Sequence, residues 1–282
     1  MKRRVKALTV VLAICLITVF IRCQSNETPI QQLVVVVNGD SIEMVFVKGG
    51  TFMMGCTDEQ GCDCEDNEKP ARKESVSDFY IGKYEVTQRL WRAVMDTDSI
   101  LPFNGGCGDC PMENVSWKNA QEFIGRLNAM TGKTFRLPTE AEWEDAARGG
   151  HKSKHYKYSG SNQVSEVAWY VGNSSGGQYG EAGTTRPVGL KKSNELGLYD
   201  MSGNVWEWCG DLYTKEYKQG GKSIHPGWPF ECTYLFFRRI LRGGSWGGTA
   251  KGCRVSYIDY DIENYSDEYG GFRLVMEPES IK

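Results

Sequence analysis

Hydrophobic positions recur at helical spacing in several parts of the chain. Between Ser116 and Gly132 the apolar residues repeat every three or four positions, which predicts an amphipathic helix that Ser116 caps and Gly132 ends. Similar spacing after Thr87 predicts another helix. Thr139 followed by Glu142 has the form of a capping box for a helix that ends at Gly149. We expect the apolar stripe that follows Ser116 to face a core.

Other segments have the pattern of strands or loops. Residues 38–51 run apolar toward two glycines, which predicts a strand entering a turn, and residues 79–86 and 167–171 also have strand patterns. Residues 153–185 are rich in Gly, Ser and Tyr and predict loop. Residues 56–70 are acidic, and we expect them to form a solvated loop. The 33 glycines, with 8 tryptophans and 14 tyrosines, indicate a loop-rich globule with large aromatic anchors.

The helix after Thr139 carries three glutamates, which could suggest acid–base chemistry. Glu142 is expected to be the capping partner, and Glu140 and Glu144 to be surface carboxylates. A catalytic reading is therefore not needed for this helix.

The first 22 residues have the pattern of an export signal. A basic start is followed by the apolar residues 7–21, which are too few to span a membrane comfortably. Cys23 comes next, so the segment resembles a bacterial lipoprotein signal with Cys23 lipidated and residues 23–33 as a polar tether. Arg22 stands where a small residue is usual, which leaves ordinary secretion or an uncleaved anchor open. We expect an exported lipoprotein of the cell envelope, in the outer membrane or on the cell surface.

Charge adds little to this view. The chain has 36 acidic and 33 basic residues, so its balance gives no general reason to expect nucleic acid as a partner. Its length of 282 residues is compatible with one large domain.

Eight of the ten cysteines follow the predicted anchor, and this even number outside the cytosol favours disulfides. Cys62 with Cys64 and Cys107 with Cys110 could instead supply four thiolates to zinc, although the first spacing is not the usual one. Spacing alone leaves open the connectivity of Cys56, Cys62, Cys64, Cys107, Cys110 and Cys232.

The run from Asn194 to Asp211 concentrates unusual residues. Asp200 and Glu207 flank Gly203 and its neighbouring asparagine, residue types that readily adopt positive φ and turn carbonyls toward a common point. Such a turn suits calcium, which prefers oxygen ligands. On spacing alone, a tight turn with solvated acids is an equal alternative.

Four ordered motifs carry a family resemblance. They are MVFVKGGTFMMG with FYIGKYEVTQRLW (residues 44–91), NVSWKNAQEF with RLPTEAEWEDAARGG (114–150), GLYDMSGNVWEW (197–208) and LRGGSW with GGFRLV (241–275). The chain from residue 34 to residue 282 thereby resembles the formylglycine-generating enzyme, or sulfatase-modifying-factor, family. The resemblance implies a single α+β domain related to C-type lectins, with little regular secondary structure. It also implies a structural calcium ion held by Asp200, Gly203, Val205 and Glu207, the glycine and valine through their carbonyls.

The same resemblance bears on catalysis. In members that oxidise a sulfatase cysteine to formylglycine, the serine of GGS is followed three and eight positions later by two cysteines that hold copper(I). Here Ser245 is followed by Gly248 and Cys253, so one sulfur is missing and a two-thiolate copper site cannot be built. The family places the segments of Cys209 and Cys253 together, which implies a disulfide between them. We therefore expect no copper and no catalysis, the alternative being an oxidase that uses Cys253 with help from Ser245.

The segment from Gly247 to Gly270 suggests a different activity. It is rich in Tyr, Asp, Ser and Gly, the composition of a binding surface with rigid aromatic contacts. It also resembles variable proteins of diversity-generating retroelements, in which asparagine codons are randomised. We expect a protein or glycan ligand outside the cell, although an ordinary surface loop, or a structural component of a surface or gliding assembly, is also compatible. The expected ligand-binding residues are Trp246, Gly247, Gly248, Tyr257, Asp259, Tyr260, Asp261, Tyr265, Asp267 and Tyr269.

Overall fold

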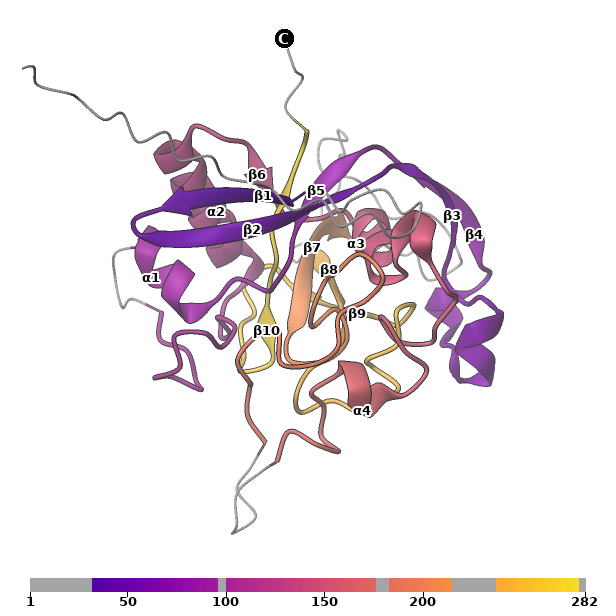
Figure 1. The fold of residues 1–282 in the computed structure, drawn as a ribbon. Coiled ribbons are helices and arrows are strands. Elements are labelled where there is room, and N and C mark those ends of the chain that lie inside the picture. The colour runs from indigo at the N-terminus through magenta and orange to yellow at the C-terminus, as the bar shows by residue number, and fades with distance from the viewer. Residues whose placement is uncertain (1–31, 96–99, 176–182, 215–236, 279–282) are drawn as a thin grey trace, which may run out of the picture.

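Three β-sheets and the helices packed on them make up the described chain (Figure 1). The structure is a computed structural model that describes residues 32–95, 100–175, 183–214 and 237–278. The sheets have the strand orders β1-β2-β5-β11-β6, β10-β7-β8-β9 and β3-β4. The strands are β1 Gln32–Val37, β2 Asp40–Val47, β3 Gly50–Met54, β4 Arg72–Val76, β5 Phe79–Gly82, β6 Phe135–Arg136, β7 Trp206–Leu212, β8 Arg238–Arg242, β9 Ile258–Ile262, β10 Gly270–Gly271 and β11 Val275–Met276. The helices are α1 Gln88–Met95, α2 Trp117–Thr131, α3 Glu140–Ala147 and α4 Val164–Val167.

The five-stranded sheet is covered on both faces because its central strands bury alternate residues in opposite directions. Met44 belongs to the core beneath α1 and α2, where the rings of Trp91 and Phe123 stack with centroids 5.3 Å apart. The adjacent Val45 belongs to a second core with Trp143 of α3. In Figure 1, α1 and α2 lie at one end of the β1–β2 hairpin and the β3–β4 hairpin lies at the other.

The predicted helices are confirmed together with their caps. The hydroxyl of Ser116 accepts the backbone N–H of Asn119 at 3.2 Å, and α2 ends at Gly132 with φ +66°. The Thr139 hydroxyl accepts the backbone N–H of Glu142 at 3.2 Å, as the capping box requires. The mixed sheets and helices confirm the α+β class.

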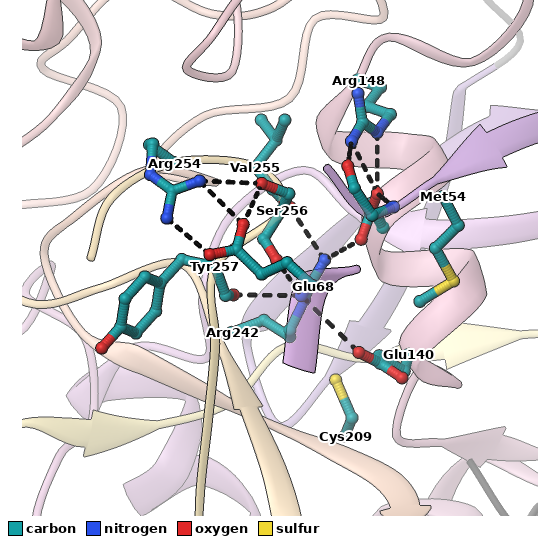
Figure 2. A network of polar contacts seen from close by, with 12 residues as sticks. Met54, Glu68, Glu140, Arg148, Cys209, Arg242, Arg254, Val255, Ser256 and Tyr257 are labelled. Atoms are coloured by element: carbon teal, nitrogen blue, oxygen red, sulfur yellow. Dashed lines mark hydrogen bonds and ion pairs between the residues drawn. The ribbon is translucent and has the colours of Figure 1, made fainter. Parts of the chain in front are cut away.

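Several sequence predictions were wrong. Residues 167–171 do not form a strand, because α4 extends to Val167 and a turn follows. Glu140 and Glu144 are fully buried against Arg242 rather than exposed on the surface (Figure 2). Strand β1 begins at Gln32, inside the predicted tether, because its residues pair with β2.

The acidic loop at 56–70 is also not simply solvated. It contains two 3₁₀ turns, Asp58–Asp63 and Asp66–Glu68, and its Glu68 is fully buried. The predicted signal, residues 1–22, and Cys23 lie outside the described residues. Among the helices that the structure describes, none is long and apolar enough to cross a membrane.

Candidate functional site

One face of the four-stranded sheet collects side chains from three strands. In the register of this sheet Trp208 lies opposite Leu241, and Leu241 lies opposite Asp259. Residues two apart on a strand share a face, so Trp206 and Asp261 join the same surface. This face forms the floor of the candidate site.

The chain after β9 forms a wall beside that floor and is held by its backbone. The carbonyl of Asp267 accepts the N–H of Asn114 at 2.8 Å, and the carbonyl of Tyr269 accepts the N–H of Trp206 at 2.7 Å. The indole N–H of Trp246 donates to the carbonyl of Glu268 at 2.9 Å. Because these contacts use main-chain atoms of the wall, they do not depend on the side chains that the wall displays.

Floor and wall enclose a cavity of about 250 Å³. A neighbouring cavity of about 470 Å³ shares Asp259 and Tyr260 with it. We call the first the aromatic–acidic cavity; it is lined by Val115, Trp206, Trp208, Leu241, Asp259, Tyr260, Asp261, Tyr265, Ser266, Asp267, Tyr269 and Gly270. The second is lined by Glu65, Asp66, Asn67, Tyr213, Tyr257, Ile258, Asp259 and Tyr260.

The structure brings most of the predicted ligand-binding residues to these cavities. Trp246 instead lies behind the wall, 7% exposed, with its ring centroid 4.8 Å from that of Tyr269. Gly247 and Gly248 do not line either cavity. Sequence reasoning included Asp259 and Asp261 of the floor but missed Trp206, Trp208 and Leu241. The two-residue spacing of the two tryptophans within an extended run is a signal for a shared face.

The residues of the alternative catalytic reading are buried. Ser245 is 2% exposed and Cys253 is fully buried, with its sulfur 3.6 Å from the carbonyl oxygen of Thr249. Burial raises the pKa of the Cys253 thiol to about 12. At neutral pH this thiol is therefore protonated, and a protonated thiol is a poor nucleophile.

The predicted disulfide between Cys209 and Cys253 is wrong, because both cysteines are free. They belong to different cores: Cys209 packs with Trp143, and Cys253 packs with Tyr158. Their separation explains why no bond joins them.

The disulfides that do form are Cys56–Cys64 and Cys107–Cys110. The zinc alternative fails as a result, since three of its four sulfurs are oxidised. Cys62 is free and exposed, and Cys232 lies outside the described residues.

The predicted calcium turn has the expected backbone. Asp200, Gly203 and Asn204 have φ values of 56°, 80° and 66°. One carboxylate oxygen of Asp200 accepts the N–H of Gly189 at 2.7 Å, whereas Oδ1 is buried without a hydrogen-bond partner. No hydrogen bond from a described residue ends on the carbonyl of Gly203 or Val205. These three oxygens are free to bind a cation.

The charges around this turn also suit a cation. Glu207 is fully buried and paired with Arg273, with the Arg273 Nη2 to Glu207 Oε1 distance at 2.6 Å. Glu85, which sequence reasoning missed, is a third buried carboxylate beside Asp200 and Glu207. Burial, then the charges of those two neighbours, raises the pKa of Glu85, and burial raises the pKa of Asp200 to about 6. Three carboxylates therefore face one guanidinium.

Of the four predicted calcium ligands, Glu207 is already neutralised by Arg273. The described residues contain no group of three His, Cys, Asp or Glu side chains placed to hold a metal. A calcium ion at this turn would therefore depend on the carbonyls of Gly203 and Val205, and its binding stays a prediction.

The sequence and the structure are similar to those of several known proteins. Residues 35–278 match the family described as the sulfatase-modifying factor enzyme 1-like domain. The chain is 34% identical to the chaperone protein LppX of Paenibacillus barcinonensis over 77% of this chain and 83% of that protein. It is 29% identical to the inactive C-alpha-formylglycine-generating enzyme 2 of Bos taurus over 76% of this chain and 80% of that protein. The solved structure of Treponema denticola variable protein 1 is similar with a TM-score of 0.70 and 30% identity, covering 89% of this chain and all of that one.

Proposed function

The chain belongs to the sulfatase-modifying factor enzyme 1-like family, and we propose that it is a non-catalytic member that binds a ligand outside the cytosol. Three relatives support a role of this kind. One is named a chaperone, one an inactive enzyme and one a variable protein. The ligand face is the aromatic–acidic cavity together with its neighbour.

The main observation behind this proposal concerns the two positions at which catalytic relatives have copper-binding cysteines. Gly248 stands where the first of the two copper-binding cysteines would be, which leaves only Cys253, a buried thiol whose pKa burial raises to about 12. The residues present therefore do not fit copper(I), which prefers a pair of soft thiolates. No catalytic step is assigned to this chain.

The experiment measures copper binding and formylglycine formation together. The full-length chain in detergent is titrated with copper(I) and incubated with a peptide that carries the sulfatase motif, and the aldehyde is sought by mass spectrometry. We expect no stoichiometric copper and no aldehyde. Turnover by the wild-type chain that disappears in Cys253→Ser would overturn the proposal.

A gain-of-function variant provides the matched control. Gly248→Cys restores the two-cysteine spacing, and a Cβ at this position would lie 3.3 Å from the Ser245 carbonyl oxygen, a contact that a small shift relieves. We expect this variant to acquire copper(I). If the variant binds no copper(I), the missing sulfur at position 248 is not what prevents copper binding by the wild-type chain.

Diversification of the ligand face is a finer part of the proposal. The likeness to variable protein 1 supports it, as does the set of residues in 257–270 that mutated asparagine codons can encode. Glu263 and Glu268 are not among them. A near-copy of the DNA for residues 246–272 beside a reverse transcriptase gene is the expected finding, and neighbouring genes with neither feature would contradict it.

Export and anchoring are further parts of the proposal, supported by the N-terminal sequence. Residues 1–22 would direct export, and Cys23 would carry the lipid that holds the protein at a membrane. Labelling of cells with radioactive palmitate should mark the wild-type chain and not Cys23→Ser. Equal labelling of both would refute the anchor.

A further inference from the structure

The aromatic–acidic cavity holds three carboxylates that have no cationic partner. Asp259, Asp261 and Asp267 are partly buried, and one oxygen of each accepts a backbone N–H two or fewer residues away, at 2.7–3.0 Å. Among the described residues no ion pair ends on any of the three. Burial is the largest cause of the raised pKa values of Asp259 and Asp267.

Buried acids elsewhere in the molecule fall into two groups: Glu85, Glu113 and Asp200 have no ion pair with a described residue, whereas a second group is neutralised within the chain. Four glutamates with little or no exposure are each held by an arginine. The pairs are Glu68–Arg254, Glu142–Arg136, Glu144–Arg242 and Glu207–Arg273. The three cavity aspartates lack such an arginine and line an open cavity, so a positive charge from outside the chain can approach them.

Two arginines of β8 lie near the cavity without an ion pair to its aspartates, and the guanidinium of one of them, Arg238, lies 5.1 Å from the ring centroid of Tyr260. Arg239 lies opposite Asp261 in the register, but its guanidinium donates to Glu263 at 2.8 Å and to the carbonyl of Gly210 at 2.7 Å. It also stacks 3.9 Å from the ring centroid of Trp117. No Lys or Arg side chain lines the cavity.

The aromatic lining complements this charge. Trp206, Trp208, Tyr260, Tyr265 and Tyr269 line the same cavity as the three carboxylates. Trp208 is 1% exposed and its indole N–H donates to the carbonyl of Val115 at 2.9 Å, so this ring forms the base of the cavity. A cation beside the more exposed aromatic rings is attracted by their π electrons in addition to the carboxylates.

Size and geometry narrow the ligand. A cavity of about 250 Å³ is smaller than the roughly 300–1,000 Å³ that encloses a drug-sized molecule, and it matches a single long side chain. A metal ion is disfavoured because the described residues hold no group of three acidic, His or Cys side chains placed for one. A neutral sugar would satisfy hydrogen bonds but leave three negative charges uncompensated.

We propose that this cavity receives the cationic side chain of an arginine or lysine presented by a peptide or protein ligand. The inference rests on the proposed binding function and specifies the chemistry of its ligand. Long-range attraction by the three carboxylates would also make association sensitive to salt.

The test uses the full-length chain in detergent and two matched probes. Nα-acetyl-arginine amide and the uncharged isostere Nα-acetyl-citrulline amide are titrated and followed by ligand-observed NMR. We expect the arginine probe to bind at least about tenfold more tightly, which corresponds to ~1.4 kcal/mol. The triple variant Asp259→Asn/Asp261→Asn/Asp267→Asn should lose this preference, whereas Asp58→Asn, an exposed acid outside the cavity, should retain it.

Selection of a random peptide library on the same protein distinguishes the proposed cationic ligand from the binding function in general. Enrichment of Arg or Lys at one position, lost in the triple variant, supports the cationic ligand. Binders that depend on Tyr265 and Tyr269 but carry no enriched cation would overturn the cationic ligand and leave the binding function intact. The absence of any binder that depends on this face would overturn both.

Discussion

Glu68→Gln should destabilise the protein strongly, because it removes one partner of a buried ion pair. The pair is formed by Glu68 and Arg254, whose side chains are 0% exposed, and the Arg254 Nη2 and Nη1 atoms donate to the two carboxylate oxygens of Glu68 at 2.6 and 2.7 Å. Arg254 Nη2 also donates to the carbonyl of Asp63 at 3.2 Å, so the pair joins the acidic loop at 56–70 to the segment leading into β9 (Figure 2).

The magnitude follows from the burial of both partners. Removing one member of a buried pair leaves an uncompensated charge and costs about 3–5 kcal/mol. For a domain of this size, ~2–4 °C of Tm accompanies each kcal/mol, so the melting temperature should fall by about 6–20 °C. That is a large part of the roughly 5–15 kcal/mol that stabilises a typical domain.

Urea denaturation followed by tryptophan fluorescence measures this loss. The double variant Glu68→Leu/Arg254→Met removes both charges and should recover most of the stability. Glu122→Gln, which breaks the exposed pair with Arg126 on α2, should cost only about 0.3–0.5 kcal/mol. A loss below about 1 kcal/mol in Glu68→Gln would refute the reasoning, because it would mean that the Arg254 charge is not buried without compensation.

The pH dependence gives an independent check on the same pair. Burial opposes ionisation, but the hydrogen bonds from Arg254 and Ser256 outweigh it and lower the pKa of Glu68 below 4.5. The stabilisation is therefore present above pH 4.5 and is lost as the pH falls through the folded-state pKa. Glu68→Gln lacks this group, so the stability gap between the two proteins should narrow in acid.

The remaining predictions concern calcium, a buried acid and the free thiols. Calcium at a hundred times its Kd should raise the free energy of unfolding by about 2.7 kcal/mol. Neither EDTA-treated protein nor the Asp200→Asn variant should show this gain. Equal unfolding curves with and without calcium would exclude the site. Burial and the Glu144 charge raise the pKa of Asp145 to about 7, so the folded state loses stability as the pH rises from 3.8 toward 7. In urea unfolding, Asp145→Asn should therefore be up to about 4 kcal/mol more stable than wild type at pH 8, and the two proteins should be equally stable near pH 4. Iodoacetamide should label exposed Cys62 in the native protein, while buried Cys209 and Cys253 should react only in denaturant, as peptide mapping would report.

Local signals in the sequence were sufficient to predict the helices. Caps such as Ser116 and Thr139 act on residues three positions away, so their effect is visible in the sequence itself. The positive φ values at Gly203 and Asn204 are similarly local consequences of residue type. The ligand face was predictable in outline because its wall, residues 263–270, is one continuous segment.

Contacts between distant segments could not be predicted in the same way. Glu144 looks like a surface residue in its helix, and its burial depends on Arg242, 98 residues later. The expected Cys209–Cys253 bond came from the adjacency of two segments, but adjacency does not fix which core each side chain enters. The floor residues of β7 and β8 were missed for the same reason, since these strands meet β9 only after folding.

The path of the chain into β9 is held by buried arginines rather than by the side chains that line the cavity. The buried arginines act mainly on the backbone and on acids away from the cavity; Arg242, for example, donates to the carbonyls of Val255, Ser256 and Tyr257 at 2.8–3.0 Å. Those carbonyls fix the path of the chain into β9 whatever side chains follow. Tyr265, which is 43% exposed, makes no comparable contribution to the core. We therefore expect substitution of exposed cavity residues such as Tyr265 to cost the fold little stability.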